Sequence, residues 1–527
     1  MAERSSTEER AGGDVGQKFI LVVDLGTSII RCHVYNKAAH IVAQAEKQTE
    51  LVYPEPGAVE IEPDNLWKKF IDVVRQALHS GNFCPSDMSC MGITTFRNSF
   101  LLWDRDTGEH FGNINTWQDT RTKDIVKSWN NSLILATVKS GAGILHALTR
   151  SQKFKAGRAV KFLTAAVSVR LKWLIDNNEK LQSRVNQQKV MFGTLETWLL
   201  WKLSGEKVWI TDRASASGTL LYDTFQGTWS SLLCGLVGIP LHILPEISST
   251  CITLAVCDSS IFGHNIPITA SMADQQASLF GHCCFDLGDI KLTLGTGSFL
   301  NVNTGVKPLA FVTGIYPLVA WEIGQEVTFC AEGNTVTLGT CMDWLKSVGI
   351  IANVAASSDM AKSVSDTNNC YFVPAFSGLA APINDDSASG LLIGLSASVT
   401  AAHITRAVLE SFAFVIKLQY ETMLADCGRT VNHIRVDGGV ANNDFVLQCI
   451  ADVLQKPIHR PHTLNMTSRG AAFMAGLGAK IWTSLEELKS LKPDETVFQP
   501  QETSSYYKKA FTNWEKAVSR SKAWHTA

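Results

Sequence analysis

Two strand–turn–strand segments of similar design, far apart in the chain, most constrain how this sequence can fold. The first runs from Phe19 to Asn36 (FILVVDLGTSIIRCHVYN), and the second runs from Gly288 to Gly305 (GDIKLTLGTGSFLNVNTG). In each segment a short apolar strand enters a polar turn that contains glycine, and a second strand returns. Such a pair predicts a duplicated domain, with the two turns facing each other across a cleft.

The first turn, Asp24 to Ser28 (DLGTS), offers groups that can bind a phosphate. Its glycine lets the backbone approach an anion, its N–H groups and hydroxyls can point at that anion, and its aspartate can hold a cation. The same residues also suit an ordinary hairpin with a capping aspartate. The local sequence does not separate these two interpretations.

Length and charge limit the classes of function. A chain of 527 residues is too long for one ordinary core, so we expect two domains or more. Hydrophobic residues make up 45% of the chain and charged residues 18%, which is typical of a globular protein. The formal net charge of -2 argues against nucleic acid or an anionic membrane as the main partner of the whole protein, and it leaves room for local basic patches.

The N-terminal residues, the apolar runs and the cysteines together predict where in the cell the protein is located. We expect the polar residues 1–17 to form a disordered tail and not a secretory signal. The most apolar later run, Ser231 to Pro245, is too short and interrupted to span a bilayer. Thirteen scattered cysteines without a C-x-x-C pair fit a reduced cytosolic protein better than a disulfide framework or a zinc site. We therefore expect a cytoplasmic protein without a transmembrane segment.

Several stretches have the pattern of helices. Apolar residues recur at helical spacing from Pro63 to Ser80, and the apolar run from Thr194 ends at the glycine stop Gly205. The basic region from Val138 to Gln188 is weakly patterned, and we expect a surface helix and a loop there.

The second half contains two further glycine turns. Asp437-Gly438-Gly439 follows a strand, and Asn443 then opens a helix, which gives an amide-rich surface suited to a purine and its ribose. A plain strand-to-helix turn with an asparagine cap is the alternative. The segment Ala331 to Leu345 offers a comparable break, in which Gly339 allows close approach. No Walker A motif and no G-x-G-x-x-G after a strand is found, so a nucleotide would be bound by the paired hairpins.

Two more segments can hold a substrate. Arg97 and Asn98 follow a strand, where Arg97 is either a surface charge or a planar donor for neighbouring hydroxyls. Asp274 begins a helix of small residues, where it is either an N-cap or a group that takes a proton from an alcohol.

In their order, these elements resemble the FGGY carbohydrate kinases, and within that family most closely the glycerol kinases, from about Phe19 to Trp524. The most specific pieces are DLGTS, ADQQASLFG, LGTGSF, VDGG.ANN and SRGAAFMAGLG. The resemblance implies an α/β fold of two actin/Hsp70-like ATPase (ribonuclease H-like) domains with the active site in the cleft between them. It implies an N-terminal domain over residues 18–281 and a C-terminal domain over residues 282–527.

The resemblance also implies roles for single residues. Asp274 matches the general base, and Asp24 lies toward the magnesium ion. Arg97, Asn98, Asp274 and Gln275 match the positions that bind the polyol. The positions that match nucleotide-binding residues of the family are Gly26, Thr27, Ser28, Arg31, Gly295, Thr296, Gly339, Gly439 and Asn443.

By this resemblance we expect the ATP- and Mg²⁺-dependent phosphorylation of glycerol to sn-glycerol 3-phosphate, as in glycerol and triglyceride metabolism, with no nucleic-acid partner and with a homo-oligomer as a possible assembly. Two departures keep alternatives open. Asn98 stands where glycerol kinases carry a glutamate, and Ala165 stands where a substrate tyrosine is expected. The alternatives are a kinase for another small polyol or ketose, and a nucleotide-binding pseudokinase with a regulatory role.

Overall fold

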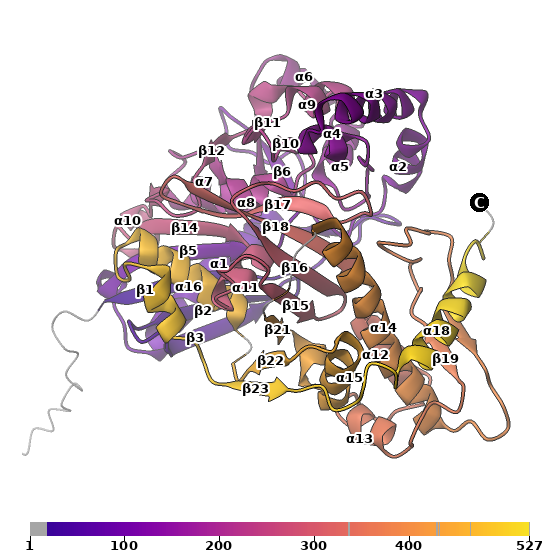
Figure 1. Ribbon diagram of the computed structural model, residues 1–527. Helices are drawn as coiled ribbons and strands as arrows, with labels where there is room; N and C mark the ends of the chain where they lie inside the picture. Colours follow the sequence, from indigo (N-terminus) through magenta and orange to yellow (C-terminus); the bar gives the residue numbers. More distant parts are fainter. Residues whose placement is uncertain (1–17, 336–337, 428–430, 432, 464, 526–527) are drawn as a thin grey trace, which may run out of the picture.

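The computed structural model of the protein describes residues 18–335, 338–427, 431, 433–463 and 465–525. The tail predicted for residues 1–17 lies outside the described residues. Two large mixed sheets form the body of the molecule, and helices cover their faces (Figure 1).

The first hairpin belongs to a six-stranded sheet near the N-terminus. Its central strand is β1, which pairs with β2 and, in parallel, with β5. The strands, in spatial order, are β13 (Ala255–Val256), β14 (Pro267–Ala273), β5 (Met88–Thr95), β1 (Phe19–Leu25), β2 (Ile29–Tyr35) and β3 (Ile41–Gln48).

The second hairpin belongs to a seven-stranded sheet with the same central pattern. Strand β15 is antiparallel to β16 and parallel to β21, as β1 is to β2 and β5. The two hairpins predicted from the sequence are therefore confirmed. The strands, in spatial order, are β17 (Tyr316–Ile323), β18 (Glu326–Thr335), β16 (Ser298–Gly305), β15 (Ile290–Leu294), β21 (Ile434–Asp437), β22 (Ile458–Pro461) and β23 (Glu495–Phe498).

Strand β1 is apolar along nearly its whole length because both faces of its sheet are covered. Leu21 and Val23 belong to one buried cluster, whereas Ile20 and Val22 belong to another. The first cluster includes helix α1 (Pro63–Ser80), which has the bounds expected from its apolar spacing. The second cluster includes helix α16 (Met466–Gly478).

Helices α16 and α11 (Asp274–Gly281) approach each other unusually closely. A Cβ atom at Gly470 would lie closer than 3.0 Å to the Ala277 carbonyl oxygen, and one at Gly281 would lie as close to the Met466 carbonyl. Both positions therefore need glycine. Helix α11 also contacts strands of both sheets, so this helix pair joins the two halves of the molecule.

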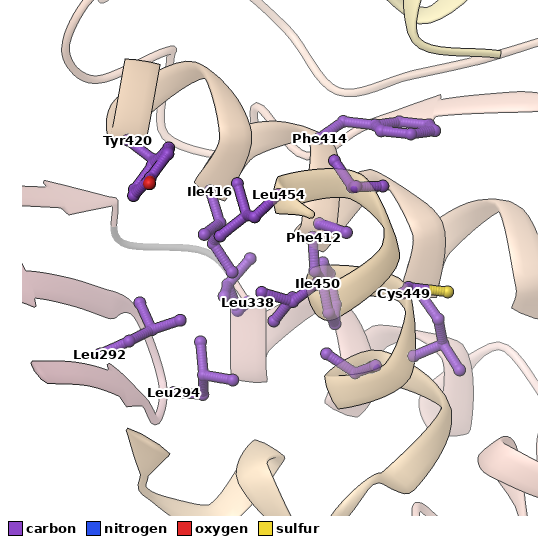
Figure 2. Close-up of a cluster of buried hydrophobic side chains, with 14 of the residues drawn as sticks. Leu292, Leu294, Leu338, Phe412, Phe414, Ile416, Tyr420, Cys449, Ile450 and Leu454 are labelled. Carbon is purple, nitrogen blue, oxygen red and sulfur yellow. The ribbon is translucent and has the colours of Figure 1, made fainter. Parts of the chain in front are cut away.

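The C-terminal sheet packs on helices α12 (Leu338–Ser347), α14 (Ala401–Cys427) and α15 (Asp444–Leu454). Figure 2 shows Leu292 and Leu294 of β15 pointing toward Leu338, Phe412 and Ile450 of these helices. This core fixes the end of β15, from which the second glycine turn begins.

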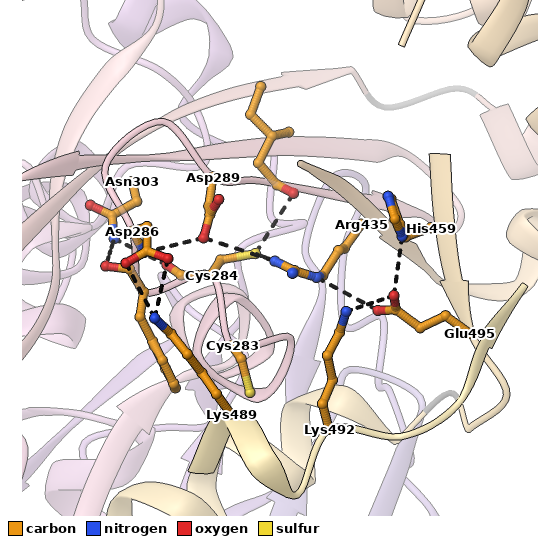
Figure 3. Close-up of polar contacts among 12 residues, drawn as sticks. Cys283, Cys284, Asp286, Asp289, Asn303, Arg435, His459, Lys489, Lys492 and Glu495 are labelled. Carbon is orange, nitrogen blue, oxygen red and sulfur yellow. Dashed lines mark hydrogen bonds and ion pairs between the residues drawn. The ribbon is translucent and has the colours of Figure 1, made fainter. Parts of the chain in front are cut away.

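A buried polar cluster lies near the edge of the same sheet that is formed by β21, β22 and β23 (Figure 3). The Arg435 guanidinium lies 3.9 Å from the Asp289 carboxylate and 3.6 Å from that of Glu495. Burial alone would raise the pKa of Glu495, but hydrogen bonds from His459 and Lys492 together with the Arg435 charge lower it to about 2. These contacts attach β23 to the sheet.

A smaller sheet and several helices extend from the N-terminal half. Helix α7 (Leu195–Leu203) confirms the helix predicted from Thr194 to Gly205, although it ends two residues earlier. The sheet consists of β4 (Glu60–Ile61), β7 (Ile114–Asn115), β6 (Phe100–Asp104) and β8 (Val190–Thr194). The helices are α2 (Lys123–Asn130), α3 (Leu133–Thr149), α4 (Gln152–Gly157), α5 (Val167–Asp176), α6 (Glu179–Asn186), α7 (Leu195–Leu203) and α9 (Ser231–Val237).

Within the described ranges, no single helix is both long enough and apolar enough to cross a bilayer. Helices α2 and α3, bent by 50° relative to each other, reach the required length and composition only as a pair.

The cysteines, all of which lie in the described part of the chain, differ sharply in accessibility. Cys84 is exposed, Cys251 and Cys427 are half-buried, and the others are buried. Burial raises the pKa of the buried thiols, for example that of Cys90 to about 12.

Candidate active site

Three parallel strands of the N-terminal sheet end side by side and bring their following residues together. In the ladder, Asp24 of β1 pairs with Thr94 of β5, and Thr94 in turn pairs with Met272 of β14. Arg97 follows β5, and Asp274 directly follows β14. The carboxyl ends of parallel strands are the usual place for a ligand site in such sheets.

Arg97 joins the two halves of the molecule at this edge. Its guanidinium Nη2 donates to the Glu332 carboxylate on β18, at 2.5 and 2.6 Å from the two oxygens. Its Nε lies 3.7 Å from Asp274 Oδ1. Asn301 on β16 also donates to Glu332, at 2.8 Å. Arg97 is therefore a buried, paired cation and not a free surface charge.

Asp274 occupies the first turn of α11. Its Oδ1 accepts a hydrogen bond from the Gln275 backbone N–H at 2.8 Å, and 24% of its side chain is exposed. Burial raises the pKa of Asp274, and the charges of Arg97 and Lys291 partly offset this rise. A carboxylate that is held in place and partly accessible can accept a proton from a bound hydroxyl.

A chain of hydrogen bonds runs from Gln275, which follows Asp274, to the C-terminal sheet. The buried Lys291 ammonium donates to Gln275 Oε1 at 2.6 Å and to Thr293 Oγ1 at 2.9 Å. Thr293 in turn donates to Asp437 Oδ1 at 2.5 Å. Burial lowers the pKa of Lys291, whereas the carboxylates of Asp437 and Asp274 oppose that shift. The Gln275 side chain is thus fixed by a cation that the sequence analysis did not identify.

Asn98 lies next to Arg97 in a left-handed conformation, with φ of 59°, which asparagine tolerates better than most residues. Its side-chain oxygen is buried and has no hydrogen-bond partner within the described structure. The Arg170 guanidinium donates to the backbone oxygens of both Asn98 and Ala165, at 2.5 and 2.8 Å. Asn98 and Ala165, two positions at which the resemblance predicts a departure from the glycerol kinase pattern, therefore lie close together.

Asp24 is buried at the end of β1. Burial raises the pKa of Asp24 to about 7, the Arg31 charge on the adjacent strand lowers it in part, and the Asp274 carboxylate adds to the rise. Arg31 Nε also lies 3.3 Å from Glu46. The site thus contains two neighbouring carboxylates, Asp24 and Asp274, and the positive charge of Arg31 only partly offsets the cost of ionising the buried Asp24.

The first glycine turn is held at its two sides. Thr49 donates from its hydroxyl to the Gly26 carbonyl at 3.2 Å and from its N–H to the Ser28 carbonyl at 2.8 Å. The Trp117 indole donates to Thr27 Oγ1 at 3.1 Å. Ser28 is exposed.

The second glycine turn packs against the start of α12. The Gly339 N–H donates to the Thr296 carbonyl at 2.8 Å, and a Cβ atom at Gly339 would lie 2.8 Å from Thr296 Cα. The Gly295 N–H donates to the Gly297 carbonyl at 2.8 Å. Thr296 is exposed. Three of the candidate nucleotide residues, Gly295, Thr296 and Gly339, thus lie in contact.

The third glycine turn follows β21, the parallel neighbour of β15. A Cβ atom at Gly439 would meet open space, which leaves its backbone accessible. Asn443 caps α15, because its Oδ1 accepts from the Val446 N–H at 3.1 Å, and its amide donates to Ser357 Oγ at 3.0 Å. The cap predicted as the alternative role of Asn443 is therefore present.

Residues 19–281 match the N-terminal domain of the FGGY family of carbohydrate kinases, and residues 290–479 match its C-terminal domain. The chain therefore belongs to this family, whose members transfer a phosphoryl group and take ATP as a substrate. It is 44% identical to glycerol kinase 5 of Danio rerio over 98% of this chain and 99% of the relative. It is 42% identical to glycerol kinase 5 of Homo sapiens over 98% of each chain.

Solved structures agree with the predicted fold. A crystal structure of Plasmodium falciparum glycerol kinase with ADP aligns with a TM-score of 0.87 and 28% identity, over 96% of this chain and 98% of that one. A ligand-bound xylulose kinase from Lactobacillus acidophilus aligns with a TM-score of 0.78 at 19% identity, which shows the fold alone. The two-domain α/β architecture of the actin/Hsp70-like ATPase type is confirmed.

The raised pKa of Asp24 predicts that this residue lowers the stability of the free protein. A carboxyl whose pKa is about 7 when folded and 3.8 when unfolded favours folding most below pH 4 and loses that contribution as the pH rises through 7. In metal-free buffer at pH 8, we expect Asp24→Asn to increase the free energy of unfolding by about 2 kcal/mol or more. Thermal unfolding at a series of pH values measures this.

The gain should shrink as the pH falls from 7 toward 4, because Asp24 of the folded wild type then binds a proton and no longer carries a buried charge, whereas asparagine does not titrate. Asp124→Asn, on the exposed surface of α2, is the matched control and should change stability little at either pH. A Tm for Asp24→Asn at or below that of the wild type at pH 8 would contradict the prediction.

Proposed function

We propose that this chain phosphorylates glycerol at the expense of ATP and forms sn-glycerol 3-phosphate. The observation that carries the proposal is the Arg97 guanidinium held between Glu332 and Asp274, with Asp24 at the neighbouring strand end. The names of the relatives, which are glycerol kinases, support glycerol as the substrate.

In the proposed reaction Arg97, Asn98 and Gln275 bind the polyol hydroxyls, and Asp274 accepts the proton of the attacking hydroxyl. A carboxylate is a suitable base because the alcohol loses its proton late in phosphoryl transfer. The buried cation at Arg97 also stabilises the ionised form of Asp274 before the substrate binds.

We propose that the nucleotide lies between the glycine turns of the two sheets. Gly26, Thr27, Ser28 and Arg31 would face the phosphates from the first turn. Gly295 and Thr296 would face them from the second turn, and Gly339, Gly439 and Asn443 would lie toward the nucleoside. Exposed hydroxyls at Ser28 and Thr296 and the open backbone at Gly439 are consistent with these roles.

Mg²⁺ fits this donor set as an ion that arrives with the nucleotide. Among the described residues, no group of three or more His, Cys, Asp or Glu side chains is arranged to hold a resident metal. Mg²⁺ in kinases uses one or two carboxylates together with phosphates and water, and the poorly compensated carboxylate of Asp24 provides such a ligand. The ion would neutralise charge on the transferred phosphoryl group.

A second candidate function is the phosphorylation of another small polyol or ketose. Asn98 and Ala165 favour it, since an amide replaces a charge-assisted acceptor and a substrate tyrosine is absent at the same place. A pseudokinase would retain nucleotide binding at the glycine turns and lack turnover.

The test is Mg²⁺-dependent ADP formation by the purified full chain with glycerol, dihydroxyacetone, glyceraldehyde and several pentoses. We expect saturable turnover with glycerol and slower turnover with the others. Turnover with another polyol and none with glycerol would overturn glycerol as the substrate, and the same mechanism would then apply to that polyol. ATP binding without turnover on any of them would favour the pseudokinase.

A further inference from the structure

Helix α3 presents an apolar face to solvent. Leu133, Ile134, Ile144 and Leu148 expose 85%, 65%, 63% and 76% of their surface, and Leu145 exposes 43%. Figure 1 shows α3 at the outer edge of the molecule, beside α2, α4 and α5 and away from the two large sheets. Contiguous exposed aliphatic side chains of this kind mark an interaction surface in a folded protein.

The polarity of α3 is inverted relative to an ordinary surface helix. Every exposed residue of α3 is uncharged, whereas its two titratable side chains, Lys139 and His146, lie on the half-buried side. The His146 imidazole Nδ1 is 3.0 Å from the Ser151 carbonyl oxygen. Leu135 is buried and anchors the helix to the protein. The solvent side of α3 thus resembles the buried side of a normal helix.

Basic residues are frequent in the segments before and after this apolar face. Residues 123–161 contain eight lysines and arginines and one acidic residue, Asp124, although the whole chain has a formal net charge of -2. Lys127 of α2 is exposed, and so are Arg150 and Arg158, which follow α3 and α4. A local excess of exposed positive charge therefore lies near this exposed apolar helix, although Lys153 and Lys161 of the same region are paired with Asp223 and Asp386.

We propose that α3 docks the enzyme on an anionic lipid surface. The aliphatic face enters the boundary between headgroups and acyl chains, and the exposed basic side chains of Lys123, Lys127, Arg150 and Arg158 contact anionic headgroups. Interfacial helices combine these two features, and each cation near an anionic leaflet adds to the attraction. The exposed face of α3 has no aromatic or arginine anchor of the kind that dominates protein–protein interfaces, which favours lipid as the occupant.

The experiment is co-sedimentation of the purified full chain with two kinds of vesicle, phosphatidylcholine alone and phosphatidylcholine mixed with phosphatidylserine. We expect binding to the mixed vesicles that weakens with added salt. The variant Ile144→Glu with Leu148→Glu should lower the partition coefficient by roughly tenfold or more, because two buried aliphatic contacts are replaced by repelled charges. Arg150→Glu with Arg158→Glu should lower it on the mixed vesicles only.

Leu232→Glu is the matched control, since Leu232 on α9 is also 67% exposed but lies outside this basic region. Equal ADP formation by all variants verifies that each is folded, because α3 carries none of the candidate site residues. Absence of binding, or equal binding to both kinds of vesicle, would overturn the proposal. Sedimentation velocity that shows a dimer dissociated by the α3 variant, without vesicle binding, would assign the face to a second copy of the chain instead.

Discussion

Replacement of Asp274 by asparagine is expected to lower kcat for the preferred polyol by roughly 10²–10⁴-fold, the usual contribution of a positioned general base. An amide has nearly the shape of the carboxylate, and its oxygen can still accept the hydrogen bond from the Gln275 N–H. It cannot take up a proton at neutral pH. The loss should therefore appear in kcat, with a much smaller change in the affinity for ADP, and coupled assays and calorimetry measure the two quantities.

Asp452→Asn provides the matched control for this substitution. Asp452 is also a buried aspartate with backbone and side-chain donors, but it lies on α15, away from the strand ends that form the candidate site. It should leave kcat unchanged. Retention of more than half of the wild-type kcat by Asp274→Asn would show that another group accepts the proton.

Gly470→Ala is expected to lower the stability of the protein strongly, although it adds a single methyl group. The added Cβ would lie closer than 3.0 Å to the Ala277 carbonyl oxygen, which is backbone and cannot rotate away. Overpacking in cores typically costs 1–3 kcal/mol, and a backbone clash lies at about the upper end of that range. Urea unfolding should show a loss of about 3 kcal/mol.

The same change should also lower kcat, because α11, which carries Asp274 in its first turn, must move away from α16. Gly143→Ala is the control, since a Cβ atom at this helical glycine of α3 would meet nothing within 4 Å and should be neutral or slightly stabilising. Equal stability of Gly470→Ala and the wild type would mean that the helix contact is looser than the structure indicates.

The parts of the fold that local chemistry determines could be predicted from the sequence. The two hairpins have an uninterrupted apolar strand before a glycine turn, and both are present. The helix at Pro63–Ser80 buries the residues that its spacing selected, because one face of a 3.6-residue repeat meets the sheet. Asp24, Arg97 and Asp274 were candidates because each follows an apolar strand.

Other parts of the site depend on contacts between distant segments. Glu332 accepts hydrogen bonds from Arg97 and Asn301, and Lys291 donates to Gln275. None of these residues stands at a recognisable sequence spacing from its partner. In the segment around Glu332, only Gly339 had a local sequence pattern that suggested a role. Partners more than 200 residues away, such as Glu332 for Arg97, are selected by the arrangement of the sheets, which a single sequence does not specify.

The exposed apolar face of helix α3 could not be predicted for a different reason, although a surface helix was expected in the region from Val138. Pattern recognition assumes that apolar residues face inward, and α3 places them outward, so the region from Val138 appeared weakly patterned. Its basic composition was visible in the sequence, but its apolar exposure could be seen only in the structure.

The unequal accessibility of the cysteines offers a practical benefit for spectroscopy. Cys84 is the one exposed cysteine of the thirteen, all of which the structure describes, and burial keeps most of the others protonated and shielded. A maleimide fluorophore would therefore attach selectively to Cys84 in the native chain, without engineered mutations. With a fluorescent nucleotide as acceptor, energy transfer from this label would follow ligand binding in solution.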